Sequence, residues 1–211
     1  MSTIQQIAAA VEAGKAKEIA ALVQAALDAG VAPVEILNAG MIDAMSIVGD
    51  KFQKEEIFVP EMLIAARAMK KGVEVLQPHI GEAGAAAIGK VIIGTVVGDL
   101  HDIGKNLVSM MIESAGFEVE DLGVDVPHEK FVEAAESDEN VSIVACSALL
   151  TTTMPALRDA VAALNTCKNR ASFKIMVGGA PITQEFSDEI GADAYAPDAA
   201  SAAKAAKGLV S

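Results

Sequence analysis

The chain has 211 residues, of which 52% are apolar and 21% are charged, and its formal net charge is −13 at pH 7. This is enough apolar material for the core of one ordinary domain or of two small ones. Phosphate groups attract Lys and Arg, so an acidic chain without a basic segment is a poor match for nucleic acid or an anionic membrane surface. We therefore expect neither as a partner.

The apolar stretches, the first residues and the two cysteines bear on the compartment of the protein and on the redox state of its thiols. No uninterrupted apolar stretch approaches the roughly 20 residues of a membrane helix. The first residues lack the cationic and apolar pattern of a signal peptide. Cys146 and Cys167 do not have the spacing of a metal motif, and Cys146 lies in an apolar run typical of a buried strand. We expect two reduced structural thiols in a cytoplasmic protein.

Residues 1–86 have the apolar period of helices. Four runs carry it, and their apolar positions are Ile4, Ile7 and Val11; Ile19, Leu22, Val23, Ala26 and Leu27; Val34, Leu37, Met41, Met45 and Val48; and Met62, Ala65, Ala66, Met69, Val73 and Leu76. Gly14, Gly30 and Gly49 separate the runs, and Pro60 is typical of a helix start. We predict a four-helix bundle, followed by a glycine-rich linker at 81–89.

From Lys90 onward, β-branched runs alternate with helical patterns. The predicted strands are Val91–Val97, Phe117–Leu122, Val141–Ala145, Lys174–Val177 and Ala192–Ala196, and the helices between them include 127–137, 155–164 and 181–190. This alternation predicts an α/β fold, a Rossmann-like (flavodoxin-like) doubly wound sheet of five parallel strands. Ligands of such sheets bind at the carboxyl ends of the strands, so we expect functional residues just after Val97, Ala145 and Val177.

Of the three segments that follow these strand ends, the one after the first strand contains the side chain with the most chemical possibilities. His101 follows Asp99 by two residues, with Gly98 and Gly104 on either side. A carboxylate at this spacing can hold one imidazole nitrogen while the other binds a metal. One His and one Asp cannot hold a free zinc ion, but they can supply one axial ligand to a metal already held by a macrocycle. A helix N-terminus with acidic caps and an incidental His is the alternative.

The ends of the third and fourth strands carry hydroxyls and glycines. Ser147 is followed by Thr151, Thr152 and Thr153, and four hydroxyls in seven residues exceed the needs of one N-cap, although capping alone is the alternative. The pair Gly178–Gly179 allows either a tight turn or close approach of a ligand to the backbone.

These segments together resemble a known family. Asp99-x-His101-x-x-Gly104, then Ser147-x-Leu149, then Gly178-Gly179 is similar to the three-part signature of the cobalamin-binding domains of methionine synthase and of small corrinoid methyl carriers. The segment 48–62 resembles the helical cap module that precedes those domains. The resemblance implies a cap domain at 1–86 and a cobalamin-binding, Rossmann-like domain at 90–211.

The resemblance also implies roles for individual residues. His101 would replace the cobalamin's own base as the lower axial ligand of cobalt, in a triad with Asp99 and Thr153, where methionine synthase has Ser in place of Thr. The implied cofactor-binding residues are Gly98, Asp99, His101, Asp102, Ile103, Gly104, Ser147, Leu149, Thr151, Thr153, Gly178 and Gly179. Phe52, Val59 and Met62 would cover the upper face of the corrin, with ordinary bundle core as the alternative.

The implied function is that of a corrinoid methyl carrier in one-carbon metabolism, with no turnover of its own. A substrate-specific methyltransferase would methylate the Co(I) form, and the methyl-Co(III) form would pass the group to a second methyltransferase acting on tetrahydrofolate or a thiol. A reductive activator would be a further partner. Methanol, methylamines, quaternary amines and aryl methyl ethers all remain open as methyl donors, because the donor is bound by the partner enzyme.

Other functions compete with this one. A B12-dependent sensor or regulatory domain is the main alternative. Such a sensor would be expected to include a DNA-binding module, and the acidic charge of this chain argues against DNA binding. A mutase fragment would require a large barrel that is not in this chain. A phospho-receiver domain requires an acceptor Asp at the end of the third strand, where this chain has Cys146 and Ser147.

Overall fold

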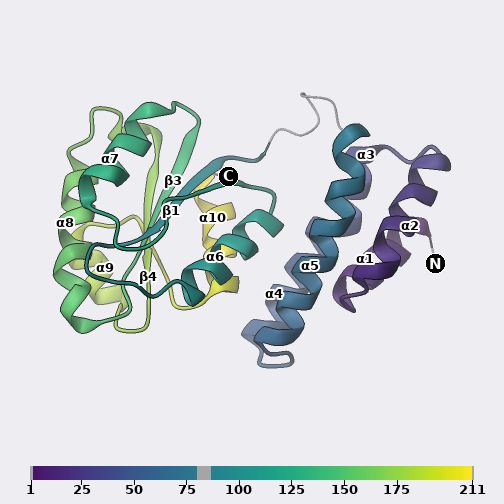
Figure 1. Ribbon diagram of the computed structural model, residues 1–211, viewed down its shortest axis with the longest axis horizontal. Coiled ribbons are helices and arrows are strands. Elements are labelled where there is room, and N and C mark those ends of the chain that lie inside the picture. Colours follow the sequence, from purple (N-terminus) through teal and green to yellow (C-terminus); the bar gives the residue numbers. More distant parts are fainter. Residues whose placement is uncertain (1, 80–86, 211) are drawn as a thin grey trace. The chain divides into compact units, whose positions relative to one another are not determined.

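The computed structural model describes residues 2–79 and 87–210. Contacts divide the chain into two compact units, Met1–Ala86 and Ala87–Ser211 (Figure 1). Most of the linker predicted at 81–89 lies outside the described residues. Ile88, near its end, belongs to the second unit, because its N–H donates to the carbonyl of Gly116 at 3.0 Å.

The first unit is helical, as predicted. Its elements are α1 (Thr3–Glu12), α2 (Ala16–Asp28), α3 (Pro33–Glu35), the π-helix η1 (Ile36–Ile42), α4 (Asp43–Gln53), α5 (Val59–Leu76) and the 3₁₀ turn η2 (Gln77–His79). Because α3, η1 and α4 follow one another without a break, the described elements form four helical segments, which confirms the predicted bundle. Ser2 begins α1 with a reciprocal capping box to Gln5.

The π-helical segment changes which residues of the third run face the core. Val34 was predicted to be apolar core but is 42% exposed, whereas Ile36 is fully buried. A π turn spans five residues, and Ile36 and Met41, five apart, are both buried. The run returns to ordinary helical spacing afterwards with Met45 and Val48. The predicted break at Gly49 was wrong, since a single interior glycine weakens a helix without ending it.

The second unit is a parallel sheet of five strands in the order β2-β1-β3-β4-β5. The strands are β1 (Lys90–Thr95), β2 (Glu118–Asp121), β3 (Val141–Ser147), β4 (Lys174–Gly178) and β5 (Ala194–Ala196). The helices are α6 (Ile103–Ser114), α7 (His128–Ser137), α8 (Met154–Asn165), α9 (Gln184–Ile190) and α10 (Ala199–Val210), with 3₁₀ turns η3 (Thr151–Thr153) and η4 (Arg170–Ser172). Figure 1 shows α6 and α10 on one face of the sheet and α7 and α8 on the other, which confirms the doubly wound architecture.

Two element boundaries differ from the sequence prediction. The first strand ends at Thr95 instead of Val97, because Val96 forms only an isolated bridge to Val126 and the chain then turns at Gly98. The helix predicted from residue 181 begins at Gln184. The hydroxyl of Thr183 accepts a hydrogen bond from the N–H of Phe186, and this N-cap fixes the start.

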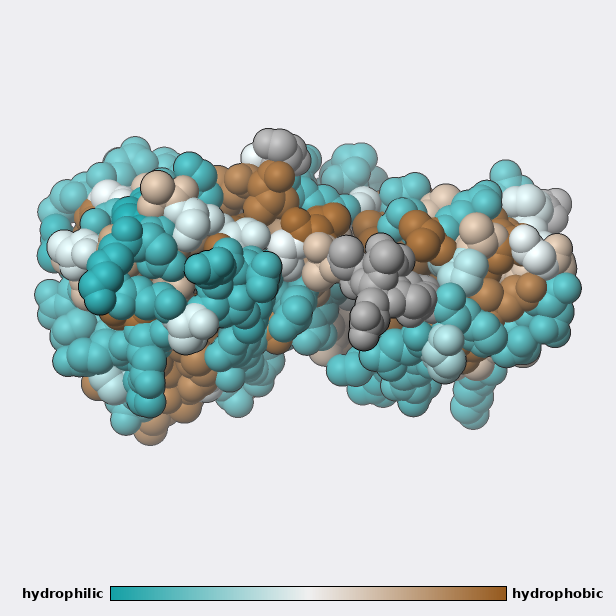
Figure 2. Space-filling model, turned by 90° about the horizontal axis from the view of Figure 1, so that it is seen from above, coloured by the Kyte–Doolittle hydropathy of each residue, from teal (hydrophilic) through white to brown (hydrophobic). Residues whose placement is uncertain are grey.

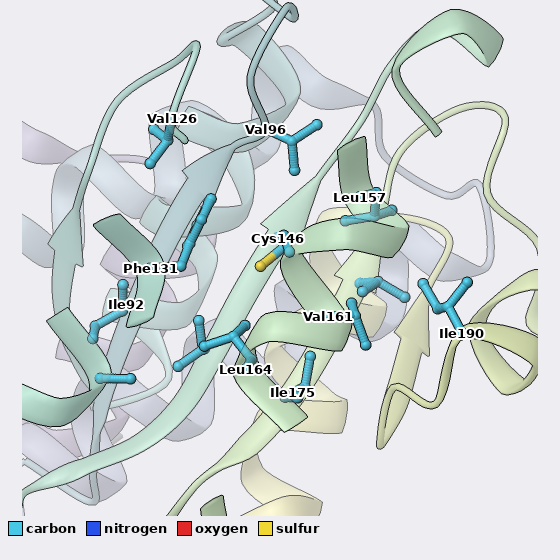
Figure 3. Close-up of a cluster of buried hydrophobic side chains, with 14 of the residues drawn as sticks. Ile92, Val96, Val126, Phe131, Cys146, Leu157, Val161, Leu164, Ile175 and Ile190 are labelled. Carbon is cyan, nitrogen blue, oxygen red and sulfur yellow. The ribbon is translucent and has the colours of Figure 1, made fainter. Parts of the chain in front are cut away.

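One face of the sheet carries a continuous apolar core between the strands and α7, α8 and α9. Phe131, Leu157 and Ile175 are fully buried in it (Figure 3). Cys146 points into the same core, and both cysteines are buried and free, as expected of structural thiols. Burial raises the pKa of each thiol, so neither is a reactive thiolate at neutral pH.

The surface seen in Figure 2 is mainly hydrophilic, with hydrophobic patches between the polar residues. Large apolar side chains are exposed on both units, and they are Val34, Ile47, Phe58, Val59, Ile64, Ile88, Val97, Leu100, Ile103, Leu149 and Leu150. Among the helices of the described residues, none combines the length and apolar composition that a membrane span requires.

Candidate functional site

The predicted site residues gather at the carboxyl edge of the sheet because β1, β3 and β4 are neighbours in register. Thr95 pairs with Ser147, and Ser147 pairs with Gly178, so the three strand ends lie side by side. The backbone N–H of Ala148 donates to the carbonyl of Gly178 at 3.2 Å. Segments more than 80 residues apart in the sequence therefore form one edge, as the topology of a parallel sheet requires.

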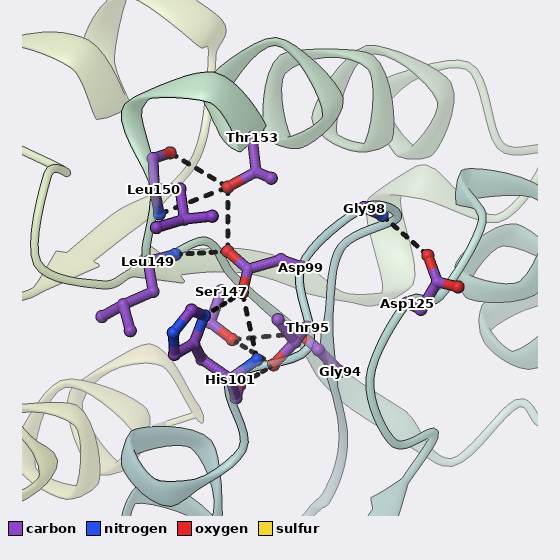
Figure 4. Close-up of polar contacts among 10 residues, drawn as sticks. All are labelled: Gly94, Thr95, Gly98, Asp99, His101, Asp125, Ser147, Leu149, Leu150 and Thr153. Carbon is purple, nitrogen blue, oxygen red and sulfur yellow. Dashed lines mark hydrogen bonds and ion pairs between the residues drawn. The ribbon is translucent and has the colours of Figure 1, made fainter.

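His101 is held by the carboxylate of Asp99 (Figure 4). Its ring nitrogen Nδ1 lies 2.9 Å from Oδ1 of Asp99, and its backbone N–H donates to the same oxygen at 3.1 Å. An ionised carboxylate only accepts hydrogen bonds, so Nδ1 carries the proton and Nε2 of the neutral ring keeps its lone pair. Asp99 thereby fixes both the orientation and the tautomer of His101.

The other oxygen of Asp99 is bound to the loop after β3. Oδ2 accepts from the backbone N–H of Leu149 at 2.7 Å and from the hydroxyl of Thr153 at 2.8 Å. Burial by itself would raise the pKa of Asp99. The hydrogen bonds from Leu149, His101 and Thr153 outweigh it and lower the pKa from 3.8 to about 2. This fully buried carboxylate is thus a permanent anion at neutral pH.

The second ring nitrogen of His101, Nε2, belongs to a half-exposed side chain. Its side chain is 52% exposed, against 0% for Asp99, and within the described residues no hydrogen bond occupies Nε2. Across residues 2–79 and 87–210, three or more His, Cys, Asp and Glu side chains nowhere gather into a metal site. A single oriented imidazole is suited to ligate a metal that another molecule already chelates on its remaining sides.

Two glycines at this edge differ in what surrounds the position where a side chain would begin. A Cβ on Gly179, whose φ is +126°, would lie 1.9 Å from the carbonyl oxygen of Ala148, so the protein's own backbone requires glycine there. A Cβ on Gly104, in the first turn of α6, would meet nothing within 4 Å. Nothing in the described protein requires glycine at that position. Open space over a helical glycine next to His101 suits a large, flat ligand that lies against the backbone.

Exposed apolar side chains lie close to His101 along the chain and beside its Asp99 partner. Leu100 is 71% exposed and Ile103 is 85% exposed, on either side of His101 in the chain, and Leu149 is 39% exposed next to the Asp99 hydrogen bonds. Exposed apolar residues close to an imidazole that is able to ligate a metal suit an apolar macrocycle better than a hydrated ion. The side chains present therefore fit a corrinoid.

The structure also locates the remaining predicted residues. Asp102 precedes α6 and accepts from the amide of Asn106 at 3.3 Å, and Thr151 is exposed in η3. Ser147 lies 3.0 Å, oxygen to oxygen, from the hydroxyl of Thr95. A Cβ on Gly178 would lie 2.8 Å from the carbonyl oxygen of Ala196.

The three predicted cap residues lie in the helical unit. Phe52 is partly buried in α4, Val59 begins α5 and is 39% exposed, and Met62 is fully buried in α5. The segment 48–62 that carries them thus spans the end of α4 and the start of α5. Their contact with a corrin stays a prediction.

Sequence reasoning missed two residues at this edge. Thr95 donates its hydroxyl proton to the carbonyl of His101 or shares it with Ser147, and Asp125 accepts from the N–H of Gly98 at 2.7 Å. Asp125 follows β2, whose carboxyl end is not one of the three strand ends that the sequence predicts to carry functional residues. The sequence Gly123-Val-Asp-Val-Pro127, polar and turn-forming at a strand end, was the available signal.

Comparison with known proteins identifies the family. A B12 binding domain model matches residues 89–206, and a second B12 binding domain model matches residues 3–77. The chain is 43% identical to dimethylamine corrinoid protein 1 of Methanosarcina acetivorans, over 98% of this chain and 97% of that one. It is 46% identical to trimethylamine corrinoid protein 2 of the same organism, over 88% and 86% of the two chains.

A solved structure agrees with these matches. The methanol:cobalamin methyltransferase complex of Methanosarcina barkeri contains a chain that superposes with a TM-score of 0.85 at 30% identity, covering 99% of this chain and 79% of that one. Both matched models and the full-length relatives concern corrinoid binding. The chain therefore belongs to the cobalamin-binding corrinoid proteins of methyltransferase systems, and it is a methyl-carrying corrinoid protein.

Proposed function

We propose that this protein carries its methyl group on a corrinoid whose own base is displaced, with His101 as the lower axial ligand of cobalt. The observation that carries the proposal is the fixed tautomer of His101. Asp99 holds Nδ1 at 2.9 Å and leaves Nε2, on a half-exposed ring, with a free lone pair. A bound corrinoid supplies the cobalt centre that accepts the methyl group and passes it on.

The residues around His101 then have defined tasks. Asp99 orients the imidazole and balances the positive charge that the ring develops as Nε2 donates its lone pair. Thr153 donates its hydroxyl proton to Asp99 at 2.8 Å or to the carbonyl of Leu150 at 2.9 Å, so its hydroxyl can turn when the charge on the Asp99–His101 pair changes. The pair can therefore follow changes in ligation by small movements of protons.

We assign residues 90–211 as the corrinoid-binding domain and residues 1–86 as the cap. The displaced nucleotide tail of the cofactor would lie along the edge formed by Ser147, Thr151 and Gly178. Phe52, Val59 and Met62 would cover the upper face of the corrin until a partner enzyme replaces them. The match of residues 3–77 to a B12 binding domain model supports the assignment of the helical unit.

The partners in this proposal are two methyltransferases and a reductive activator. The superposed methanol:cobalamin structure is a complex with a methyltransferase, which supports a donor-side enzyme as the first partner. The acceptor-side enzyme would use tetrahydrofolate or a thiol.

We further propose that a methylated amine is the methyl donor. The relatives named for dimethylamine and trimethylamine are 43% and 46% identical to this chain, against 30% for the methanol complex. The test offers the reconstituted, reduced protein to a methylamine-specific and a methanol-specific methyltransferase, each with its substrate. Methylation, followed by absorbance, is expected with the amine enzyme, and methylation with the methanol enzyme alone would contradict the amine assignment.

The ligand assignment is tested with cobinamide, a corrinoid without the nucleotide base. Nitrogen ligation of protein-bound cobinamide can come only from the protein. We expect its absorption spectrum to show an axial nitrogen with the unmodified protein and with a His128→Ala variant, but not with His101→Ala. His128 is a suitable control because it lies on α7 and its imidazole contacts only Glu129, at 3.4 Å, among the described ion pairs. Nitrogen ligation that survives in His101→Ala would overturn the assignment.

A further inference from the structure

The loop that carries His101 is held from both sides. It follows β1, the strand between β2 and β3 in the sheet. On the β3 side, the Asp99 carboxylate binds Leu149 and Thr153. On the β2 side, the contact is made by Asp125, which belongs to the loop between β2 and α7. The first of these contacts is part of the ligand triad, and the second lies outside it.

Asp125 makes a reciprocal pair of hydrogen bonds with the His101 loop. Its carboxylate oxygen Oδ1 accepts from the N–H of Gly98 at 2.7 Å (Figure 4). Its own backbone N–H donates to the carbonyl of Asp99 at 3.0 Å. The N–H of Asp99 donates to the carbonyl of Val96 at 3.1 Å. Three consecutive peptide groups between Val97 and Leu100 are therefore fixed, the first of them by the Asp125 carboxylate, and together they set the direction of the Asp99 side chain.

The backbone conformation of Asp125 indicates that this position has Asp instead of Gly because the carboxylate is needed. Its φ is +54°, one of two positive values at residues other than glycine in the part of the chain that the structure describes. Glycine adopts this conformation without strain and would keep the backbone hydrogen bond to Asp99. Only an Asp or Asn side chain, both tolerated in this region, adds the acceptor for Gly98. The chain thus accepts a strained backbone at the position where a side-chain oxygen reaches the loop.

We propose that Asp125 is a positioning residue for the cobalt ligand: by fixing the peptide of Gly98 it sets the direction of Asp99, and through Asp99 that of the His101 ring. It contacts neither His101 nor, in this proposal, the cofactor. The inference rests on the proposed role of His101 as the axial ligand. Its action is by hydrogen bonding rather than by charge, so a neutral acceptor of the same shape should replace it.

The first experiment uses the protein without cofactor. In Asp125→Ala, we expect faster hydrogen exchange of the Gly98 amide, measured by NMR, and loss of the single Nδ1-protonated tautomer of His101 in nitrogen–proton correlation spectra. Asp125→Asn, which keeps an acceptor oxygen and tolerates positive φ, should restore both signals. Glu129→Ala, which removes a nearby exposed carboxylate on α7, should change neither.

The second experiment uses the protein reconstituted with hydroxocobalamin. We expect the equilibrium constant for His101 ligation, obtained by titrating the spectrum against pH, to fall about tenfold in Asp125→Ala. This is the low end of the 10–100-fold effect that loss of an outer partner has at metal sites. Asp125→Asn should lie within about twofold of the unmodified protein.

The outcomes separate the two proposals. If the unmodified protein shows no histidine ligation, the proposed function fails. If histidine ligation is present and Asp125→Ala leaves both the tautomer and the ligation constant unchanged, only the role of Asp125 is overturned. Failure of Asp125→Asn to rescue would also overturn it, because the effect would then depend on charge.

Discussion

A charged group with several partners lies at each end of β1, Lys90 at its start and Asp99 in the loop that follows it, and the two surroundings are built differently. At the amino end, Lys90 contacts Glu120 at 2.8 Å, Asp138 at 2.9 Å and Glu118 at 3.8 Å, and these partners lie at the surface. At the carboxyl end, Asp99 is fully buried and accepts four hydrogen bonds, from His101 twice and from Leu149 and Thr153.

The difference indicates that the amino end of β1 contributes to the stability of the fold, whereas its carboxyl end positions the residues of the candidate site. Hydrogen bonds to Glu120 and Asp138 raise the pKa of Lys90, so this cation stays charged and links two strands to the loop before β3. Asp99 receives no Lys or Arg among its described partners, and its anion is balanced by oriented dipoles and one imidazole. Groups held this way keep a fixed geometry toward a ligand, whereas the three partners of Lys90 are exposed or partly exposed carboxylates, and Glu118 is 3.8 Å away from it.

The largest expected effect is at the carboxyl end. Asp99→Ala removes the acceptor of the Leu149 N–H, a partner of the His101 ring and one of the two acceptors of the Thr153 hydroxyl, and we expect a loss of about 3 kcal/mol in the free energy of unfolding. Histidine ligation of the bound corrinoid should also disappear. Denaturant unfolding and the absorption spectrum measure the two effects. An unchanged spectrum would show that Asp99 supports the fold only.

A pH effect follows from the same carboxylate. Its pKa is 3.8 in the unfolded chain and about 2 in the folded protein, so its ionisation contributes about 2 kcal/mol of stability above pH 3.8. That contribution is lost as the pH falls from about 4 to about 2. We expect unfolding free energies of the cofactor-free protein to fall more over this range than those of Asp99→Asn. Parallel pH profiles of the two proteins would contradict the lowered pKa.

A smaller effect is expected at the amino end. Lys90→Ala removes one cation from a partly exposed cluster, and we expect a loss of about 1 kcal/mol that decreases at high salt. The corrinoid spectrum should not change. A shift in histidine ligation in this variant would show that the two ends of β1 are coupled. It would contradict the separate roles assigned to the two ends.

The smallest expected effect is at Gly104, where one substitution should raise the stability of the protein and lower its affinity for the corrinoid. Gly104→Ala places a methyl group in open space within a helix, so we expect the cofactor-free protein to gain up to about 1 kcal/mol. Corrinoid affinity, measured by equilibrium dialysis, should fall because the methyl group occupies the space of the ligand. Gain of stability with unchanged affinity would place the corrin away from Gly104.

Much of the fold followed from local patterns in the sequence. The alternation of strands and helices, the order of the units and the position of His101 at a strand end needed only period, turn residues and the parallel-sheet rule. The π turn at Ile36–Ile42 did not follow, because its extra residue per turn leaves no mark in an apolar pattern read at helical spacing. The N-cap at Thr183 depends on its hydrogen bond from the N–H of Phe186, which an apolar pattern does not show.

The candidate site was only partly predictable for a similar reason. Asp99, His101 and Thr153 stood out because their residue types and strand-end positions already suggest ligand chemistry. Asp125 acts through one hydrogen bond to the backbone of a loop 27 residues earlier in the chain, and such a contact depends on the three-dimensional arrangement of two loops. For Gly179 the sequence left a tight turn and close approach of a ligand both open, and only the fold shows that its positive φ and the neighbouring carbonyl of Ala148 already require glycine.

The central claim is that Nε2 of His101 is the lower ligand of cobalt. Electron paramagnetic resonance of the reduced Co(II) form tests it directly, using protein labelled with nitrogen-15 only in histidine. We predict that the nitrogen splitting changes from a triplet to a doublet on labelling, and that the doublet is lost in His101→Ala and kept in His128→Ala. A triplet that persists in the labelled protein would mean that the cofactor's own base ligates cobalt, and it would contradict the account.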